Sequence, residues 1–388
     1  MTPPKIFLSY SRKDIADIEV IARTLMIHGI RTWQDITNLG TGLSENAIRK
    51  AIQQDCSGLL FHSTQVSVES PTILQVELPE AERKHEKDPG FHIVPIFKLS
   101  INETNSALKC CLRIPISNFN GVELDQIAKS DNILEAAQKA AEIILKEIKL
   151  SKLDPLPIGL ASQQKTSVSV ALDLNFIPFF SNGLPAQQVW NVEFSPALRH
   201  LKDMLIQKGI IVLRLHGFAH LSLGFLFGYI FRNRTGFNLE IEQITKNVRH
   251  IWSTKTTSEE NPLLINEFPG DLDSKNLCVK INLRAKDDTS FCAYAKKTNF
   301  SYRALLELTP TRYPQVITNG QAITIASELA DKIQEMHGKY STNTVHIFAA
   351  IPLGLALFMG YNLNACGKIQ CYEFDRASRQ YFPSCVLD

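Results

Sequence analysis

Apolar and polar residues alternate along the first 150 positions with two periods, which indicate short strands separated by helices. Apolar runs of strand length occur at 5–9, 30–33, 58–62 and 91–97. Apolar positions three and four residues apart indicate helices at 14–28, after Ser44, around Glu77 and at 133–150. Strands that alternate with helices are typical of a parallel sheet covered by helices. We therefore predict an α/β domain at 1–150.

The rest of the chain contains an internal repeat. Residues 151–165 hold two prolines without periodicity, so we predict a linker there and a second domain at 166–388. His216-Gly-Phe-Ala219 aligns with His346-Ile-Phe-Ala349, 130 residues later, and Leu223-Gly224 aligns with Leu353-Gly354 at the same offset. Each copy is expected to have an opening strand (168–174, 277–283), a helix (196–208, 322–336) and a closing strand (237–241, 369–374). The repeat predicts two Rossmann-like lobes, at about 166–275 and 276–388.

Composition and charge exclude several classes of protein. The 388 residues include 41 basic and 39 acidic side chains, a balance without a general affinity for DNA or an anionic membrane. The longest apolar stretch, 347–360, is interrupted by Pro352 and is shorter than the roughly 20 residues of a spanning helix. Eight scattered cysteines form no CxxC pair, and the apolar run at 6–8 is too short for a signal peptide. We expect a cytoplasmic protein without a metal site.

Several ordered motifs in the first domain resemble a TIR domain. They are Phe7-Leu-Ser-Tyr-Ser-Arg-Lys-Asp14, Ile30-Arg-Thr-Trp-Gln-Asp35 and Gly40-Thr-Gly-Leu-Ser44, with Ile48 and Ala51-Ile52 after them. In that family these segments are the first strand and its loop, the second strand, the BB loop and the next helix. The resemblance covers about residues 5–145 and implies a flavodoxin-like fold.

The resemblance also implies a catalytic glutamate. TIR domains are either adaptor scaffolds or enzymes that cleave NAD⁺ at the nicotinamide–ribose bond, and the enzymes are similar in an E-L-x-x-A motif. Glu77-Leu-Pro-Glu-Ala81 matches it, which assigns the role to Glu77 rather than Glu80 or Glu82. Loss of nicotinamide leaves an oxocarbenium-like ribose that a carboxylate stabilises. Spacing alone favours the simpler explanation that Glu77 is one of several acids on an exposed helix, and the family motif reverses this preference.

Further substrate contacts are expected around that glutamate. The predicted substrate-binding residues are Ser9, Tyr10, Arg12, Trp33 and Asp35. Asp35 ends the second strand, at the sheet edge where such folds bind ligands, although it is equally a turn-forming residue. Related enzymes often have a tryptophan four residues before the glutamate, whereas Ile73 is present here. Tyr10, Trp33 or a neighbouring subunit would then stack on the substrate. NAD⁺ is the expected substrate, and no cofactor is expected.

The second domain resembles a SAVED domain, a sensor of two CARF-like lobes found in CBASS anti-phage systems of bacteria. The residues that carry the likeness are His346-x-Phe348, Pro352, Ala356, Gly360 and Gln370-Cys-Tyr-Glu373. It implies a cyclic oligonucleotide as activator and favours a cyclic tri-adenylate. Each turn after His216 or His346 leads into a helix N-terminus, which attracts anions. His346 is at least as well explained as a core histidine.

Candidate cations lie on the strand that opens the second lobe. Alternation places Lys280, Arg284 and Lys286 on one side of the run Val279–Lys286 or just past its end. With His346, Phe348 and Pro352 they are the predicted cyclic-nucleotide-binding residues. The same pattern also fits a solvated strand edge. Arg214, Arg376 and Arg379 are further cations that the sequence does not rank.

Three functions remain open at this stage. The first is an effector in which the sensor switches on NAD⁺ cleavage, the second is a TIR scaffold that recruits partners, and the third is a nuclease, which has no supporting motif. For the first, Ile73 and the glycine-rich BB loop, with Leu39, Gly40 and Gly42, indicate a site completed by a neighbouring chain. Head-to-tail self-association into an oligomer or filament is therefore expected. Ring size and the linear or cyclic form of the ADP-ribose product stay open.

Overall fold

The computed structural model describes residues 2–34, 45–124, 132–150, 153–245, 248–284 and 289–388. Packing divides the chain into two units. The first consists of residues 1–153 and 168–176, and the second of residues 154–167 and 177–388. Each unit is described by itself.

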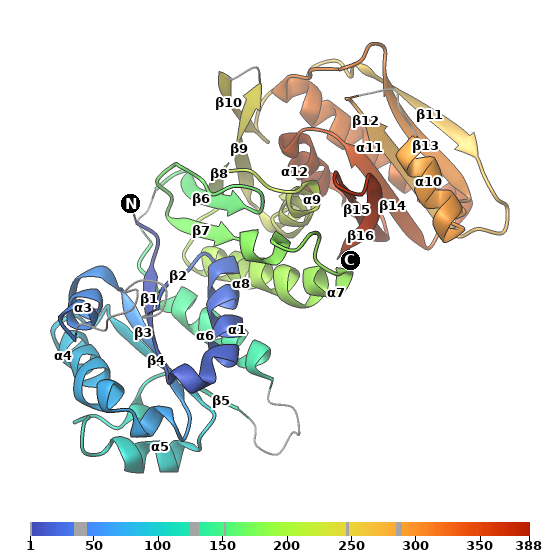
Figure 1. Ribbon diagram of the computed structural model, residues 1–388. Helices are drawn as coiled ribbons and strands as arrows, with labels where there is room; N and C mark the ends of the chain where they lie inside the picture. The colour runs from blue at the N-terminus through green and yellow to red at the C-terminus, as the bar shows by residue number, and fades with distance from the viewer. Residues whose placement is uncertain (1, 35–44, 125–131, 151–152, 246–247, 285–288) are drawn as a thin grey trace. The chain divides into compact units, whose positions relative to one another are not determined.

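The first unit is an α/β sandwich (Figure 1). Its strands are β1 (Lys5–Ser9), β2 (Arg31–Trp33), β3 (Gly58–Ser63), β4 (His92–Phe97), β5 (Val122–Glu123) and β7 (Leu172–Asn175). Its α-helices are α1 (Ile15–Ile27), α3 (Glu45–Lys50), α4 (Leu78–Lys87), α5 (Ile101–Leu108) and α6 (Ile133–Glu147). Short 3₁₀ or π-helical turns lie at Arg12–Asp14, Ala51–Asp55, Ser67–Glu69, Ile73–Glu77 and Ile116–Asn118.

The sheet of the first unit is parallel and has the order β2-β1-β3-β4-β5. Helices α1 and α6 cover one face, and α3 and α4 cover the other (Figure 1). Phe7 and Phe61 point to the second face and pack with Ile52 and Leu78, because successive strand residues alternate between faces. This arrangement confirms the flavodoxin-like fold predicted for the first domain. The carboxyl ends of β1 and β3 therefore meet at one edge of the sheet.

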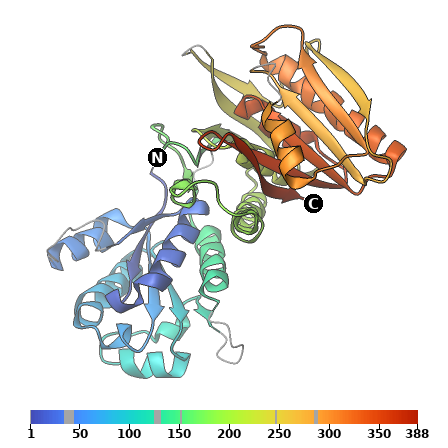
Figure 2. The same cartoon turned by 45° about the vertical axis from the view of Figure 1, so that its right-hand side comes forward.

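Two sheets make up the second unit (Figure 2). Its strands are β6 (Leu156–Ala161), β8 (Val212–His216), β9 (Asn238–Thr245), β10 (Val248–Ser253), β11 (Leu263–Pro269), β12 (Asn276–Asn282), β13 (Ala304–Pro310), β14 (Thr344–Ala350), β15 (Lys368–Asp375) and β16 (Gln380–Leu387). Its α-helices are α7 (Gln187–Val189), α8 (Ser195–Gln207), α9 (Leu221–Ile230), α10 (Thr289–Thr298), α11 (Asn319–Tyr340) and α12 (Leu353–Asn362). Short turns of helix lie at Ile177–Phe180, Trp190–Phe194 and Asn233–Thr235.

The two sheets repeat one arrangement, which confirms the pair of lobes. Among the strands of the second unit, one sheet contains β10-β9-β8-β6 in this order, and the other has the order β16-β15-β14-β12, extended by β13 and β11. Three pairs of neighbouring strands correspond between the two lobes. The pairs β6/β8 and β12/β14 are parallel, and so are β8/β9 and β14/β15. The pairs β9/β10 and β15/β16 are antiparallel. Each lobe is thus built on the same strand–helix–strand core.

The start of the first lobe differs from the sequence prediction. Residues 151–165 are not all linker, because Leu156–Ala161 forms β6 and pairs with β8. This strand, rather than 168–174, is the equivalent of β12. Pro155 precedes the strand and Pro157 lies near its start, positions where proline is tolerated. The two prolines indicated a linker in the sequence, and the buried apolar run was therefore not predicted as a strand. Residues 168–176 instead belong to the first unit, where Asp173 binds Arg31 at 2.8 Å.

Helices α9 and α12 cross with their backbones in contact. A Cβ atom added to Gly228 would lie 2.0 Å from the Leu357 carbonyl oxygen, and one added to Gly360 would lie 2.2 Å from that of Phe225. The two contacts are reciprocal at an offset of 132 residues. The predicted offset of 130 holds for β9 and β15, whereas β8 and β14 begin 132 residues apart, as the two helices do, because the loop after α12 is shorter than the loop after α9. Among the described residues, no helix is long and apolar enough to cross a membrane.

Two candidate functional sites

The first candidate site is a buried carboxylate at the carboxyl edge of the parallel sheet. Ser9, the last residue of β1, is fully buried, and its hydroxyl donates a hydrogen bond to Glu77 Oε2 at 2.6 Å. Glu77 ends the π-helical turn Ile73–Glu77 that leads into α4, and only 7% of it is exposed. The contact joins two segments that are 68 residues apart. The strand end and the helix start thus hold this carboxylate in one position.

The neighbouring glutamates have different surroundings. Glu80 forms ion pairs with Arg49 and Arg83, and it accepts a hydrogen bond from Gln53 Nε2 at 3.0 Å. Glu82 Oε1 accepts the backbone N–H groups of Arg113 and Ile114, both at 2.8 Å. These contacts hold α4 to the Ala51–Asp55 turn and to the chain after α5. The local geometry therefore favours Glu77 over Glu80 and Glu82 as the catalytic candidate.

Of the other residues predicted for this site, some lie next to Ser9 and one lies in the core. Tyr10 and Arg12 directly follow β1, close in sequence to Ser9, and Tyr10 is buried. Trp33 lies in the core, because its ring is 6% exposed and stacks on Phe7 with centroids 4.6 Å apart. This position argues against the stacking contact with substrate that the sequence suggested for Trp33.

Some predicted positions are outside the site or outside the described residues. Ile73 is 1% exposed and belongs to the same core as Phe7. Asp35, Leu39, Gly40 and Gly42 lie outside the residues that the structure describes. Their predicted roles in substrate binding and assembly remain predictions.

A partly buried polar network holds the start of α1 beside this edge. Asp17 Oδ2 lies 3.0 Å from both His62 Nε2 and Lys98 Nζ, and Thr64 donates to Asp14 at 2.7 Å. Burial lowers the pKa of His62, although Asp17 opposes the change. Burial would raise the pKa of Asp17, but the hydrogen bonds from Lys98 and His62 lower it overall. The network ties α1 to the ends of β3 and β4.

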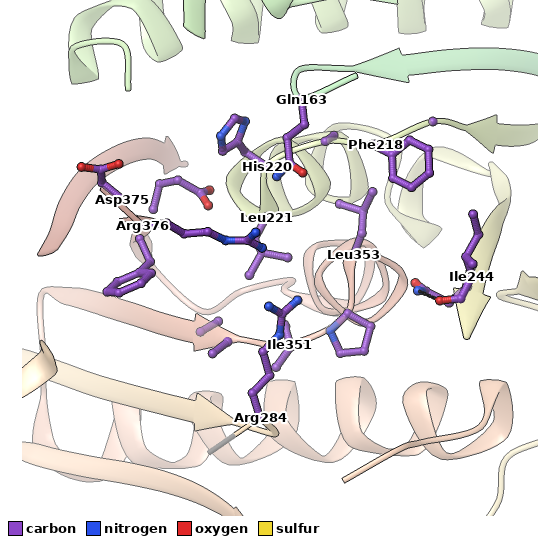
Figure 3. A pocket seen from close by; sticks show the side chains of 18 of the residues that line it. Gln163, Phe218, His220, Leu221, Ile244, Arg284, Ile351, Leu353, Asp375 and Arg376 are labelled. Atoms are coloured by element: carbon purple, nitrogen blue, oxygen red, sulfur yellow. Dashed lines mark hydrogen bonds between the residues drawn. The ribbon is translucent and has the colours of Figure 1, made fainter. Parts of the chain in front are cut away.

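The second candidate site is a pocket of about 530 Å³ in the second unit. Its wall includes both strand-to-helix turns, 217–221 before α9 and 349–353 before α12. Residues 242–244 of β9, residues 373–376 from β15 and the turn after it, and Arg284 complete most of the lining. Figure 3 shows the side chains of Arg284 and Arg376 entering the pocket from different elements. Two helix N-termini and two guanidinium groups can attract an anion to this wall, which also carries the carboxyl groups of Glu242, Glu373 and Asp375.

Each helix N-terminus in the pocket is capped by a side chain of the other lobe. Glu373 of β15 accepts the Ser222 N–H at 2.9 Å, in the first turn of α9. Gln243 of β9 accepts the Gly354 N–H at 3.2 Å, in the first turn of α12. Burial raises the pKa of Glu373 to about 7, although the hydrogen bonds from Ser222 oppose the rise. One backbone N–H group in the first turn of each helix is therefore already hydrogen-bonded inside the protein.

His220 gives the pocket an aromatic side. It is the residue before α9, its ring stacks on Phe180 with centroids 4.1 Å apart, and its Nδ1 lies 2.7 Å from Ser162 Oγ. Burial and the charge of Arg376 lower the pKa of His220 to about 4. The ring is therefore neutral at physiological pH, and it offers a flat surface beside the anion-attracting turns.

The predicted nucleotide-binding residues are divided between this pocket and other places. Arg284 and Pro352 line the pocket. Lys280 lies in an adjoining pocket of about 340 Å³, together with Arg284, Arg376 and Arg379, and it forms an ion pair with Glu307 at 2.5 Å. Lys286 lies outside the described residues.

Phe348 lies in the core of the second lobe, and His346 is half-buried beside it. Phe348 is 1% exposed and stacks on Tyr372 with centroids 4.1 Å apart. His346 Nδ1 lies 2.9 Å from the Tyr372 hydroxyl, and burial and the charge of Lys368 lower its pKa to about 4. Neither residue lines the pocket. The core explanation of His346 is therefore the better one, and the same position argues against a ligand contact by Phe348.

His220, Gln243 and Glu373 are three of the pocket residues that were not predicted as site residues. The repeat contains a signal for two of them, because Gln243 and Glu373 are 130 residues apart and so occupy equivalent strand positions. Residue His220 is in turn equivalent to Pro352, since each directly precedes its helix. The repeat therefore identifies pairs of pocket residues once one member is known.

Two family models match the chain. Residues 194–387 match the SAVED model, described as the "SMODS-associated and fused to various effectors sensor domain", and residues 6–131 match a TIR domain model. The first of these spans half of the chain.

Individual relatives are distant. CD-NTase-associated protein 4 of Enterobacter hormaechei subsp. hoffmannii is 22% identical over 218 residues, which make up 54% of this chain and 43% of that protein. The chain is also similar to the Acinetobacter baumannii Cap4 SAVED/CARF-domain receptor solved with the cyclic trinucleotide 3′3′3′-cAAA. That structure has a TM-score of 0.50 and 15% identity, and the match covers 99% of this chain and 88% of that one. The same receptor with 2′3′3′-cAAA has a TM-score of 0.49 and 17% identity, covering 89% and 85%.

Proposed function

The chain belongs to the SAVED family and carries a TIR domain, and from this premise we propose that it is a cyclic-oligonucleotide-activated NAD⁺ glycohydrolase of CBASS defence. The SAVED domain is the sensor, the TIR domain is the effector, and cleavage depletes NAD⁺ in the bacterial cytoplasm. All eight cysteines are free thiols, which agrees with a reducing compartment.

The observation that carries the enzymatic proposal is the Ser9–Glu77 contact at the carboxyl edge of the sheet. In the proposed reaction the bond between ribose C1′ and the nicotinamide nitrogen breaks, and the nitrogen keeps the electron pair. Water then adds to C1′ and releases one proton, which gives nicotinamide and ADP-ribose. Glu77 stabilises the positive charge on the ribose, and Ser9 positions Glu77. A cyclic ADP-ribose would form if an adenine nitrogen replaced water.

The observation that supports cyclic-oligonucleotide sensing is the pocket between the two equivalent turns. Arg284 and Arg376 can pair with phosphates, and His220 offers a ring on which a base can stack. The fold resembles that of a receptor solved with a cyclic tri-adenylate, so we propose the same class of ligand here. The decisive experiment adds cyclic oligoadenylates to the purified chain and measures nicotinamide release from NAD⁺ with and without each ring.

The alternative function is a non-catalytic TIR scaffold that the same ligand assembles to recruit partners. Burial of Ile73 favours it slightly, because this chain presents no aromatic ring for the substrate at that position. The nicotinamide assay separates the two functions. A chain that binds a ring and assembles, yet releases no nicotinamide at any protein concentration, is a scaffold.

Reversing the charge of Arg284 is expected to weaken activation without changing the maximal rate. Arg284→Glu removes one charge-assisted phosphate contact, so the half-activating concentration should rise at least about tenfold. Nicotinamide release is measured against ring concentration. Arg379→Glu is the control, because Arg379 lines only the adjoining pocket. An equal shift in both variants would place the ring in that adjoining pocket.

Activity per chain is expected to rise with protein concentration at saturating ligand. We propose that an adjacent chain completes each TIR site with its segment 35–44, in a head-to-tail oligomer or filament. Light scattering should therefore rise when the ring is added. Mixing a Glu77→Gln chain with a chain altered at Leu39 should restore part of the activity, since each supplies what the other lacks. Full activity of a ligand-saturated chain that sediments as a monomer would refute assembly.

A further inference from the structure

The two halves of the pocket are built alike but differ in charge. In one half the side chain that contacts the helix N-terminus is Gln243, which is neutral, and in the other it is Glu373, which is ionisable. The two backbone donors, from Ser222 and Gly354, are the second residues of α9 and α12. Glu373 lines the pocket although only 6% of it is exposed. An anion in this pocket therefore lies near a carboxylate with little water to screen it.

We propose that Glu373 couples anion binding in the pocket to the uptake of one proton, and that the neutral Gln243 leaves the other half of the pocket without this requirement. The proposal rests on the proposed function for the identity of the ligand, but the coupling itself concerns any anion. A phosphate group near an ionised Glu373 is repelled across a low-dielectric wall. When Glu373 takes up a proton, the repulsion disappears and the positive end of α9 is no longer neutralised.

The charge of Glu373 changes in the physiological range. Burial raises its pKa to about 7 in the empty pocket, so about half of the chains carry the proton at neutral pH. A bound polyanion stabilises the protonated form and raises this pKa further. Affinity is therefore highest below pH 7, and above pH 7 it falls by up to about tenfold per pH unit.

The groups around Glu373 do not produce the same dependence. Burial and Arg376 lower the pKa of His220, on the α9 side, to about 4. The hydrogen bonds from Ser378 lower the pKa of Asp375, so this carboxylate stays ionised. Burial raises the pKa of Cys371 well above its usual range, so this thiol, next to Cys385 of β16, stays neutral. The remaining charged residues of the pocket are Arg284, Arg376 and Glu242, the last of which lies 3.1 Å from His216.

The test compares the full chain with Glu373→Gln. Glutamine keeps an oxygen that accepts the Ser222 N–H, so α9 keeps its cap and the variant should fold. The affinity for 3′3′3′-cyclic tri-AMP is measured calorimetrically between about pH 6 and about pH 8. Wild type should lose affinity with rising pH, and the variant should bind about tenfold tighter than wild type at about pH 8. Contributions of all other groups cancel in the ratio of the two affinities.

Proton uptake is measured directly by repeating the titration in buffers of different ionisation enthalpy. For each ring bound, wild type should take up more protons than Glu373→Gln, and the difference should be at most one proton. The matched control is Gln243→Glu, which places a second carboxylate at the equivalent position and should weaken binding at about pH 8 by at least about tenfold. An affinity ratio that is constant with pH, or equal proton uptake by wild type and Glu373→Gln, would overturn the proposal.

A failure of the proposed ligand is distinguishable from a failure of the coupling. If no variant binds the ring, the ligand assignment is wrong, and sulfate becomes the probe because its charge is constant in this pH range. Sulfate should then raise the melting temperature of wild type more at about pH 6 than at about pH 8, and that of Glu373→Gln equally at both. Equal pH responses of the two chains to sulfate would overturn the coupling as well.

Discussion

Replacing Glu77 by glutamine is expected to slow nicotinamide release by at least about a hundredfold, the size of effect that follows loss of one aimed electrostatic group. The change removes the charge that stabilises the ribose cation and keeps the volume of the side chain. Glutamine can still accept the Ser9 hydroxyl, so the position of the π-helical turn should not change. The rate is measured at saturating activator, and the affinity for activator should equal that of wild type.

Glu80→Gln is the matched control for this result. It makes the same chemical change three residues further along, where the carboxylate pairs with Arg49 and Arg83. Its activity should stay within a few-fold of wild type, while its stability falls, because two arginines lose their partner. If Glu77→Gln keeps more than about a tenth of the wild-type rate, another group carries the reaction. A loss of activator affinity in the same variant would indicate misfolding.

Gly228→Ala is expected to cost at least about 3 kcal/mol of unfolding free energy and to abolish ligand binding. The new Cβ would lie 2.0 Å from the Leu357 carbonyl oxygen and 2.9 Å from the Tyr361 nitrogen. Both are backbone atoms of α12, so no rotamer change relieves the overlap. The helices must separate, and the turns that line the pocket then move with them.

The same substitution at Gly338 is the control for Gly228→Ala. Gly338 lies in α11, and a Cβ added there meets nothing within 4 Å. Gly338→Ala should therefore stabilise the chain by about 0.5 to 1 kcal/mol, since alanine loses less entropy in a helix. Melting temperatures and activator affinities of the two variants are compared with wild type. A Gly228→Ala chain as stable as Gly338→Ala would show that the helices do not cross this closely.

The alternating pattern of strands and helices could be predicted because each element has its own period in the sequence. The strand 156–161 was missed because Pro155 and Pro157 obscure the buried run of Leu156, Ile158 and Leu160. Glu77 could be proposed from its motif, but its contact with Ser9 depends on a strand end and a helix start that meet only in the fold.

The predicted ligand residues show why the contacts of a site are harder to predict from sequence than the elements of the fold. His346 and Phe348 belong to a signature, but Phe348 lies in the core and His346 lies 2.9 Å from the Tyr372 hydroxyl beside it, so neither lines the pocket. Glu373 was noted in the same signature without a role, because its partner Ser222 is 151 residues away. Contacts across such a distance do not follow from periodicity.

The equivalence of the two lobes has a consequence for the shape of the ligand. Equivalent positions around the pocket carry different side chains: Gln243 and Glu373, His220 and Pro352. A ring of two or four identical nucleotides has a two-fold axis, so it can present the same groups to both lobes. Such a ring would suit a pocket with the same side chains at equivalent positions of the two lobes. Three identical nucleotides have no such axis, so each lobe must meet a different part of the ring. If the proposed ligand binds here, the mismatched walls of this pocket are therefore expected to select an odd-numbered ring over an even-numbered one.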